Sequence, residues 1–429
     1  MERQYLFIDG VHAKGVTKRA TRSHVMKGKN VGRKLFRRSK QACAPLTIAK
    51  SFGYLGISLP VEIEPWSQQI INHFFEYTST RLYPINFGIM LQEVMVMYLR
   101  TICVDETVHA CCVSMMQACN EIFSSNGESS PKALNHISRN FDLIQRRIDG
   151  DDALSDSTLA IVVSLFHQEQ IRKQYAAARV HMNGLQRMVK LRGGISKLES
   201  SPYLLLKTCK IDIMFALQSG QKPMFFRDNM AYVRNVISKE GMSLACTNNA
   251  LFERYSQLDS NFQDVLVDIA GSCSLFNEKG KDVPLGMIPF LELIISICYR
   301  LLRFRPLQIP SRQNDSQGAL HLGSTIVMMT VFLQLGHLRM IDYTLISRCL
   351  QQTLTASLLD EDCELYLWLA VIGSIWTSGS EDSSWIIARV REASDRAGLK
   401  SWTELRGRIA IFPWIHVIHD LPGYEIWQQ

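Results

Sequence analysis

Residues 175–198 read YAAARVHMNGLQRMVKLRGGISKL. Apolar side chains recur here at spacings of three and four residues, which is the pattern of one buried helix face; they are Tyr175, Ala178, Met182, Leu185 and Val189. Gly193 and Gly194 follow, and glycine is the usual residue where the chain turns left-handed after a helix. The stretch therefore predicts the end of a packed helix with a glycine stop.

Three functional interpretations of this stretch compete with the structural one. A phosphate loop needs its glycines before a helix N-terminus, whereas these follow the helix, and neither GxGxxG nor GxxxxGK[ST] occurs. His181 has no nucleophile motif or orienting acid near it in sequence, so we expect a structural histidine. The lysines and arginines are a candidate nucleic-acid contact, but solvated charges near the negative end of a helix dipole are the simpler interpretation.

Helical periodicity continues along most of the chain and predicts an all-α fold, with one helical body over residues 56–429. Asp156 or Ser157 is the expected N-cap of the central tract. The longest apolar runs, 324–335 and 365–376, are shorter than a membrane span and are expected to be buried helices. Helices are predicted over 64–84, 87–123 (two helices, or one with a break), 133–148, 158–192, 203–218, 260–275, 286–304, 321–336, 341–357, 363–376, 383–397 and 402–411.

Net charge is distributed unevenly along the 429 residues. The first 50 residues contain 13 Lys and Arg against two acids, and we predict that residues 1–55 form a basic mobile arm. Its clusters resemble a bipartite nuclear-import signal, so the nucleus is the expected location; non-specific, phosphate-led nucleic-acid contact and a solvated arm are the alternatives. The candidate residues are Lys18, Arg19, Arg22, Arg33, Lys34, Arg37 and Arg38.

The 11 cysteines are scattered and include no CxxC pair. Cys103, Cys111, Cys112 and Cys119, together with His109, are the best candidate metal ligands, but buried free thiols are the more economical interpretation. Neither HExxH nor a serine-nucleophile motif is present. We therefore expect no metal, no cofactor and no enzyme activity.

The opening stretch also resembles the central signature of the fungal-specific transcription factor domain. The downstream segment 211–225, the C-terminal segment 401–427 and the N-terminal segment 7–28 are similar to further elements of that family. The resemblance implies an all-α regulatory domain and extends over nearly the whole chain. The signature residues are His181, Gly184, Met188, Val189, Leu191, Arg192, Gly193 and Gly194.

One family element is missing from this sequence. Members commonly carry a six-cysteine, two-zinc cluster that binds DNA, but the first 102 residues here contain a single cysteine, Cys43. The resemblance then implies a nuclear regulator without its own DNA reader, unless a cluster is encoded upstream. The alternative is a helical interaction module that pairs with a full-length regulator; in both cases we expect protein partners or a homodimer.

Overall fold

The computed structural model describes residues 58–429, apart from 83–90, 125–140, 142–143, 246–248, 281–284, 308–315, 334–340, 342 and 380–382. In these residues the regular structure is helical and includes no strand, which confirms the all-α class. They all belong to one compact unit, Phe52–Gln429. The predicted basic arm, residues 1–55, and all seven of its candidate side chains lie outside the described residues.

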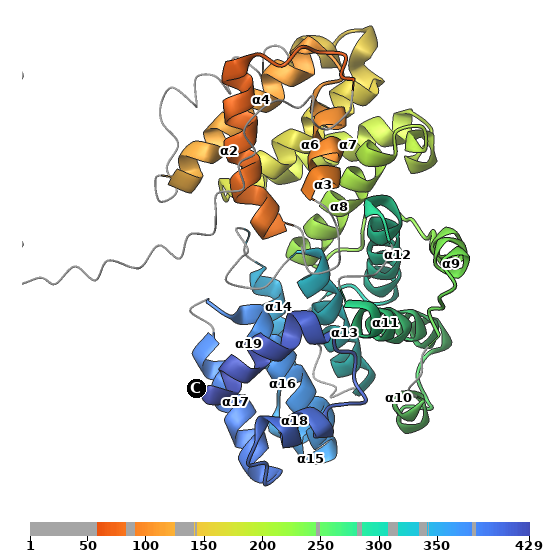
Figure 1. Ribbon diagram of the computed structural model, residues 1–429, viewed down its shortest axis with the longest axis vertical. Helices are drawn as coiled ribbons and strands as arrows, with labels where there is room; N and C mark the ends of the chain where they lie inside the picture. Colours follow the sequence, from red (N-terminus) through yellow and green to blue (C-terminus); the bar gives the residue numbers. More distant parts are fainter. Residues whose placement is uncertain are drawn as a thin grey trace, which may run out of the picture. The chain divides into compact units, whose positions relative to one another are not determined.

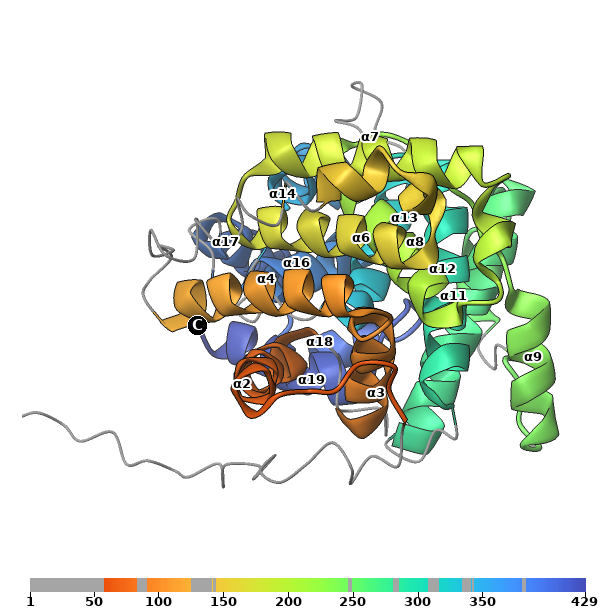
Figure 2. The same ribbon diagram turned by 90° about the horizontal axis from the view of Figure 1, so that it is seen from above.

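The first group of helices is arranged around α8 (Figures 1 and 2). α2 packs on α4, α4 on α6, and both α3 and α6 on α8. α8 is buried on every side from Leu204 to Leu217, so its ionisable side chains are buried as well. The helices of this group are α2 (Pro65–Leu82), α3 (Leu91–Ile102), α4 (Glu106–Ser124), α6 (Asp156–Ile171), α7 (Tyr175–Leu191) and α8 (Pro202–Ser219).

Two further buried helices organise the rest of the unit (Figure 1). α12 packs on α8, α9, α11 and α13, and α16 packs on α13, α17 and α19. α13 and α16 are buried along almost their whole length, as their apolar sequences predict. The remaining helices are α9 (Met230–Lys239), α10 (Ala250–Arg254), α11 (Ser260–Lys279), α12 (Met287–Phe304), α13 (Ser316–Phe332), α14 (Thr344–Thr353), α15 (Ala356–Glu361), α16 (Cys363–Thr377), α17 (Ser383–Arg396), α18 (Trp402–Arg408) and α19 (His416–Gln428).

Several helix boundaries differ from the prediction because polar side chains and turns interrupt the periodic pattern. The tract 158–192 is two antiparallel-packed helices, α6 and α7, separated at Lys173, which has a φ of +58°. The N-cap of α6 is Ser155, which accepts a hydrogen bond from the Thr158 N–H, and not Asp156 or Ser157. The tract 341–357 also divides, because Thr355 caps the separate helix α15. α9 and α19 were not predicted.

Helical spacing predicts two apolar stripes near the N-terminus, and they had different outcomes; the first is Trp66, Ile70, Phe74 and Tyr77, and the second is Val104, Val108, Cys111, Met115 and Cys119. In α2 the exposed face includes Trp66, which is 59% exposed, and the buried face is formed instead by Ser67, Ile71, Phe74 and Phe75. The stripe in α4 is confirmed for Val108, Cys111, Met115 and Cys119, all of which are buried. Val104 is exposed, because it lies in the break between α3 and α4.

The glycine stop at the end of α7 is confirmed. Gly193 and Gly194 have φ values of +99° and +104°. The Gly194 N–H donates to the Val189 carbonyl at 2.9 Å and the Gly193 N–H to the Lys190 carbonyl at 3.0 Å. These two bonds are the Schellman pattern, which satisfies the last carbonyls of a helix and redirects the chain.

Replacing Gly194 by alanine should lower the free energy of unfolding by about 1–3 kcal/mol, because its φ of +104° and ψ of 174° lie in a region that side chains rarely adopt. Gly184→Ala is the matched control. Gly184 lies inside α7 with no atom within 4 Å of an added Cβ, so alanine should stabilise by about 0.5–1 kcal/mol. Chemical denaturation of both variants checks this pair, and equal effects would contradict the assignment.

Candidate functional site: an apolar cavity with a buried lysine

The signature residues are distributed around α7 and do not converge on a shared site. Met188 and Val189 face the core, whereas Leu191 is exposed and Gly184 lies at the surface. His181 is half-buried, its ring stacks on Phe141 with centroids 6.3 Å apart, and burial lowers its pKa. These positions therefore shape the helix and its end.

Arg192 has a structural role at the same helix end. Its guanidinium pairs with Asp156 at the start of α6, and the Ser201 hydroxyl donates to the same carboxylate. The pair thus connects the start of α6 to the end of α7 and the start of α8. The sequence pattern does not reveal this role of Arg192, because its partner Asp156 lies 36 residues earlier in the chain.

Asp212 organises the segment that follows α8. Its carboxylate is fully buried and accepts hydrogen bonds from the Met224 and Phe225 N–H groups at 2.9 and 2.8 Å. The Tyr299 hydroxyl of α12 donates to it at 3.0 Å. Burial raises the pKa of Asp212 to about 6, although the three donors act in the opposite direction. The carboxylate therefore holds the 220–229 segment against α8 and α12.

The cysteines considered as metal ligands are buried thiols. The Cys103 sulfur lies 3.6 Å from His109 Nδ1, and the His109 Nε2 lies 3.4 Å from the Ser67 hydroxyl. Burial raises the pKa of Cys103 and of Cys111 to about 12, which makes both poor nucleophiles. In the part of the chain that the structure describes, no three metal-ligating side chains come together.

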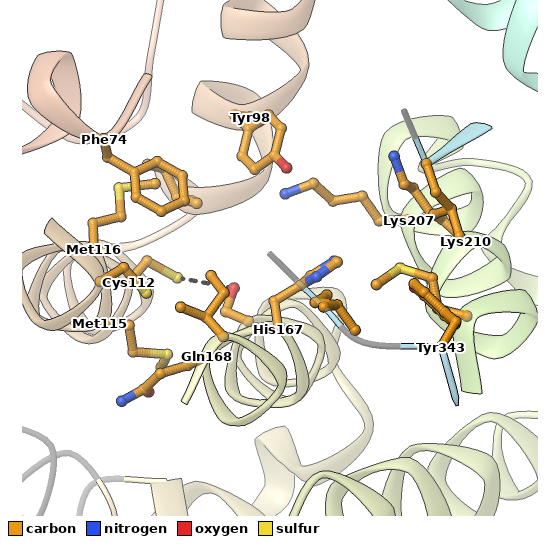
Figure 3. A pocket seen from close by; sticks show the side chains of 17 residues that line it. Phe74, Tyr98, Cys112, Met115, Met116, His167, Gln168, Lys207, Lys210 and Tyr343 are labelled. Atoms are coloured by element: carbon orange, nitrogen blue, oxygen red, sulfur yellow. Dashed lines mark hydrogen bonds between the residues drawn. The ribbon is translucent and has the colours of Figure 1, made fainter. Parts of the chain in front are cut away.

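The cavity with the most distinctive chemistry lies between α2, α3, α4, α6 and α8 (Figure 3). Its volume is about 90 Å³. The walls are mostly apolar and rich in sulfur, and none of the described residues that line it is a carboxylate. The principal lining residues are Phe74, Tyr98, Ile102, Cys112, Met115, Met116, Cys119, Ser164, His167, Gln168, Lys207, Lys210, Met214 and Tyr343.

Lys207 reaches from α8 into the middle of this cavity, toward the ring of Tyr98 (Figure 3). Its ammonium nitrogen lies 3.5 Å from the ring centroid, and the side chain makes neither an ion pair nor a hydrogen bond with any described residue. Burial, together with a smaller effect of the charge of Lys210, lowers its pKa to about 7. The aromatic face compensates only part of the cost of burying a charge, which is several kcal/mol against about 2 kcal/mol for a desolvated cation–π contact.

Two further basic groups line the same cavity. The Lys210 ammonium lies 5.0 Å from the centroid of the Phe332 ring, and burial lowers its pKa to about 8. His167 of α6 is neutral at physiological pH, because burial and the two lysines lower its pKa to about 3. The cavity thus concentrates groups that favour negative charge and repel a further cation.

Gln168 supplies the second unusual polar group. Its side chain is buried, and both the amide oxygen and the amide nitrogen lack a hydrogen-bond partner among the described residues. Leaving a buried polar atom unpaired costs about 1–3 kcal/mol. An amide donor and an amide acceptor are therefore available at the wall of the cavity, close in sequence to His167.

The described lining of the cavity supplies a cation and apolar contacts to a ligand. A lysine with a lowered pKa is a nucleophile toward carbonyl carbons, but the described lining provides no carboxylate to act as a general acid beside it. Cys112 is not a reactive thiolate, because burial raises the pKa of its thiol. Its sulfur lies 3.5 Å from the Ser164 hydroxyl. What remains is a cation and an amide in an apolar enclosure.

This site was not predicted from the sequence. Lys207 and Lys210 are three residues apart, so they share one face of α8, and their neighbours LLL and IDIM are apolar. That spacing was the only available signal, because the burial of the whole helix depends on residues from four other helices.

Compared with known proteins, the chain matches no family model, no curated protein and no solved structure.

None of the described helices is both long and apolar enough to cross a membrane. Because no family model, curated protein or solved structure matches the chain, the resemblance to the fungal-specific transcription factor domain remains an interpretation of the sequence.

Proposed function

We propose that this chain is a nuclear regulator similar to the fungal transcription factor domain, without a zinc-cluster DNA reader of its own, and that its helical body responds to a small molecule in the cavity. The observation that carries this proposal is the buried, unpaired ammonium of Lys207. A charge in such a place lowers the stability of the free protein, and features of this kind are typical of functional sites. A bound ligand that neutralises the charge would stabilise the body by mass action.

The position of the cavity supports a link between binding and the rest of the helical body. Lys207 and Asp212 are on the same helix, α8, and Asp212 holds the 220–229 segment and α12. A ligand that shifts α8 acts on both groups of helices, because α8 contacts α3, α6, α12 and α14. This arrangement supports a receiver role and requires no chemical step.

A tethered reporter tests the regulatory part of the proposal. The full chain, fused to an unrelated DNA-binding domain, should change expression from a reporter that carries the matching site. Lys207→Met should alter that output at equal protein level, whereas Lys190→Met, at an exposed position of α7, should leave it unchanged. A reporter that responds to neither the fusion nor its variants would contradict the regulatory role.

Nuclear localisation is proposed from the basic clusters alone. Replacing Lys18, Arg19, Arg33, Lys34, Arg37 and Arg38 by alanine should reduce the nuclear fraction of a fluorescently tagged chain, because import signals of this kind are recognised by their positive charge. Replacing Arg179 and Arg187, exposed basic residues of α7, is the control. An unchanged nuclear fraction in the arm variant would exclude these clusters as the address.

A helical interaction module is the second candidate function, and the outer face of α7 favours it. Val180 and Leu191 are 67% and 64% exposed there, beside the exposed bases Arg179 and Arg187. Apolar side chains surrounded by one sign of charge are suited to an amphipathic partner of opposite charge. Retention of a partner by the wild type and its loss in Val180→Asp would favour this function.

A further inference from the structure

We propose that the cavity between α2, α3, α4, α6 and α8 binds a compact monocarboxylate, a small apolar acid whose carboxylate pairs with the ammonium of Lys207. This inference rests on the proposed function, because it names the class of molecule that the helical body receives. It follows from two features of the cavity: its mostly apolar walls and the ammonium of Lys207, which has no ion-pair or hydrogen-bond partner among the described residues.

The size of the cavity restricts the apolar part of the ligand. About 90 Å³ is room for about three water molecules at about 30 Å³ each, or for one compact organic group. The surface opposite Lys207 is formed by Phe74, Met115 and Met116, which offer no hydrogen bond to water (Figure 3). Thioether side chains adapt to differently shaped apolar groups. A short aliphatic body therefore suits this space.

The charge of the cavity identifies the polar part of the ligand. One ammonium neutralises one negative charge, so a monoanion leaves no excess charge at Lys207. A phosphate dianion needs several cations or backbone N–H donors, and among the described helices only α14 contributes its N-cap residue, Tyr343, to the lining. A neutral ligand leaves the ammonium unpaired, and a cationic ligand is repelled by Lys207 and Lys210.

Gln168 lies elsewhere in the wall of the cavity. Its amide is buried, and neither of its polar atoms has a partner in the described chain. In Figure 3 this amide points away from the ammonium of Lys207, on the side of Met115, so a compact ligand that pairs with Lys207 leaves the amide unengaged.

The affinity for an acid should depend on pH in a defined direction. The titratable groups that face Lys207 are Tyr98 of α3, Cys112 and Cys119 of α4, His167 of α6, Lys210 of α8 and Tyr343. The pKa of Lys207 is lowered to about 7 and that of Lys210 to about 8, whereas His167 is already neutral. A carboxylate favours the charged lysine, so binding near pH 8 should take up protons, and affinity should fall as the pH rises.

Matched acids and amides test this inference directly. The probes are acetate, propionate and isobutyrate, each compared with its primary amide, on the full chain by isothermal titration calorimetry. We expect at least one acid to bind with an affinity at least about ten-fold higher than that of its amide, because the amide cannot form the desolvated ion pair with Lys207. Titration in buffers of different ionisation enthalpy should show proton uptake at pH 8 for the acid only.

Two variants separate the ion pair from general apolar binding. Lys207→Met should lower the affinity for the preferred acid by about ten-fold or more and abolish the proton uptake. Lys190→Met, at an exposed position of α7, should change neither. Gln168→Leu, a change of similar size away from Lys207, should leave the affinity for the acid within about two-fold of the wild type. Circular dichroism and a thermal melt confirm that each variant is folded before titration.

The outcomes distinguish the carboxylate assignment, the ligand class and the regulatory function. Equal binding of acid and amide overturns the carboxylate assignment but leaves the cavity as a site for an apolar ligand. Binding of none of the six probes overturns the ligand class. A silent reporter together with Lys207-dependent acid binding supports the site and contradicts the regulatory function, so the failure of each proposal is recognised separately.

Discussion

Asp212→Ala should lower the free energy of unfolding by about 3–5 kcal/mol. The substitution removes the shared acceptor of the Met224 and Phe225 N–H groups and of the Tyr299 hydroxyl, all of which are partly or fully buried. Each unpaired buried donor costs about 1–3 kcal/mol, and water cannot enter freely to replace the carboxylate. The loss should therefore be among the largest for a single polar residue of this chain.

Urea denaturation of the purified chain measures this loss. Asp395→Ala is the matched control, because Asp395 lies on the exposed face of α17, and its replacement should change stability by less than about 0.5 kcal/mol. A mild effect of Asp212→Ala, equal to that of the control, would show that the carboxylate does not hold the 220–229 segment. Normal unfolding cooperativity in both variants is required for the comparison.

Lys207→Met should have the opposite effect and raise the free energy of unfolding by about 1–3 kcal/mol at pH 6.5. Methionine retains the length and most of the volume of lysine but removes the buried charge. The contact with Tyr98 is lost, but a desolvated cation–π contact of about 2 kcal/mol is smaller than the several kcal/mol that burying an unpaired ion costs.

The stabilisation by Lys207→Met should shrink as the pH rises. The pKa of Lys207 is 10.5 in an ordinary environment and about 7 in the folded protein, so the unfolded chain binds more protons between these values. The stability of the wild type then increases with pH in this window, and below pH 7 the full cost of the buried charge is present. Thermal unfolding of both proteins at pH 6.5 and pH 9.5 measures the difference.

If Lys207→Met raised the free energy of unfolding equally at both pH values, Lys207 would not carry a buried charge. If it lowered the free energy of unfolding at both pH values, Lys207 would contribute to the core. Lys190→Met is again the matched control, because the lysine at this exposed position of α7 faces solvent. The same variant serves as the control for ligand binding, so stability and binding are compared in one set of proteins.

The fold class was accessible from the sequence because amphipathic spacing reports directly on burial. The stripe of α7 and the glycine stop at Gly193 and Gly194 are local features; the structure confirms the stop and the stripe from Ala178 to Val189, whereas Tyr175 at the first turn is exposed. The buried helices α13 and α16 were predicted because apolar residues cover all of their faces. The helix boundaries were less accurate, since caps such as Ser155 and Thr355 compete with neighbouring polar residues that are equally suitable by type.

The candidate site was not accessible in the same way. In the sequence, Lys207 and Lys210 have the spacing of any solvated helix face, and Gln168 is one polar residue in a helix that also carries Glu169 and Gln170. The significance of Lys207 and Gln168 comes from the absence of an ion-pair or hydrogen-bond partner among the described residues, and that property depends on side chains from α2, α3, α4 and α6.

The sequence by itself determined the all-helical body, the end of α7 and the uneven charge of the chain, because each follows from residues that are neighbours along the chain. Only the tertiary structure decided that α8 is buried on every side. It thereby turned an ordinary lysine into an unpaired cation inside an apolar cavity and paired Arg192 with Asp156. The physical reason is that burial and electrostatic partners are set by packing between segments far apart in the sequence, and no local pattern specifies them.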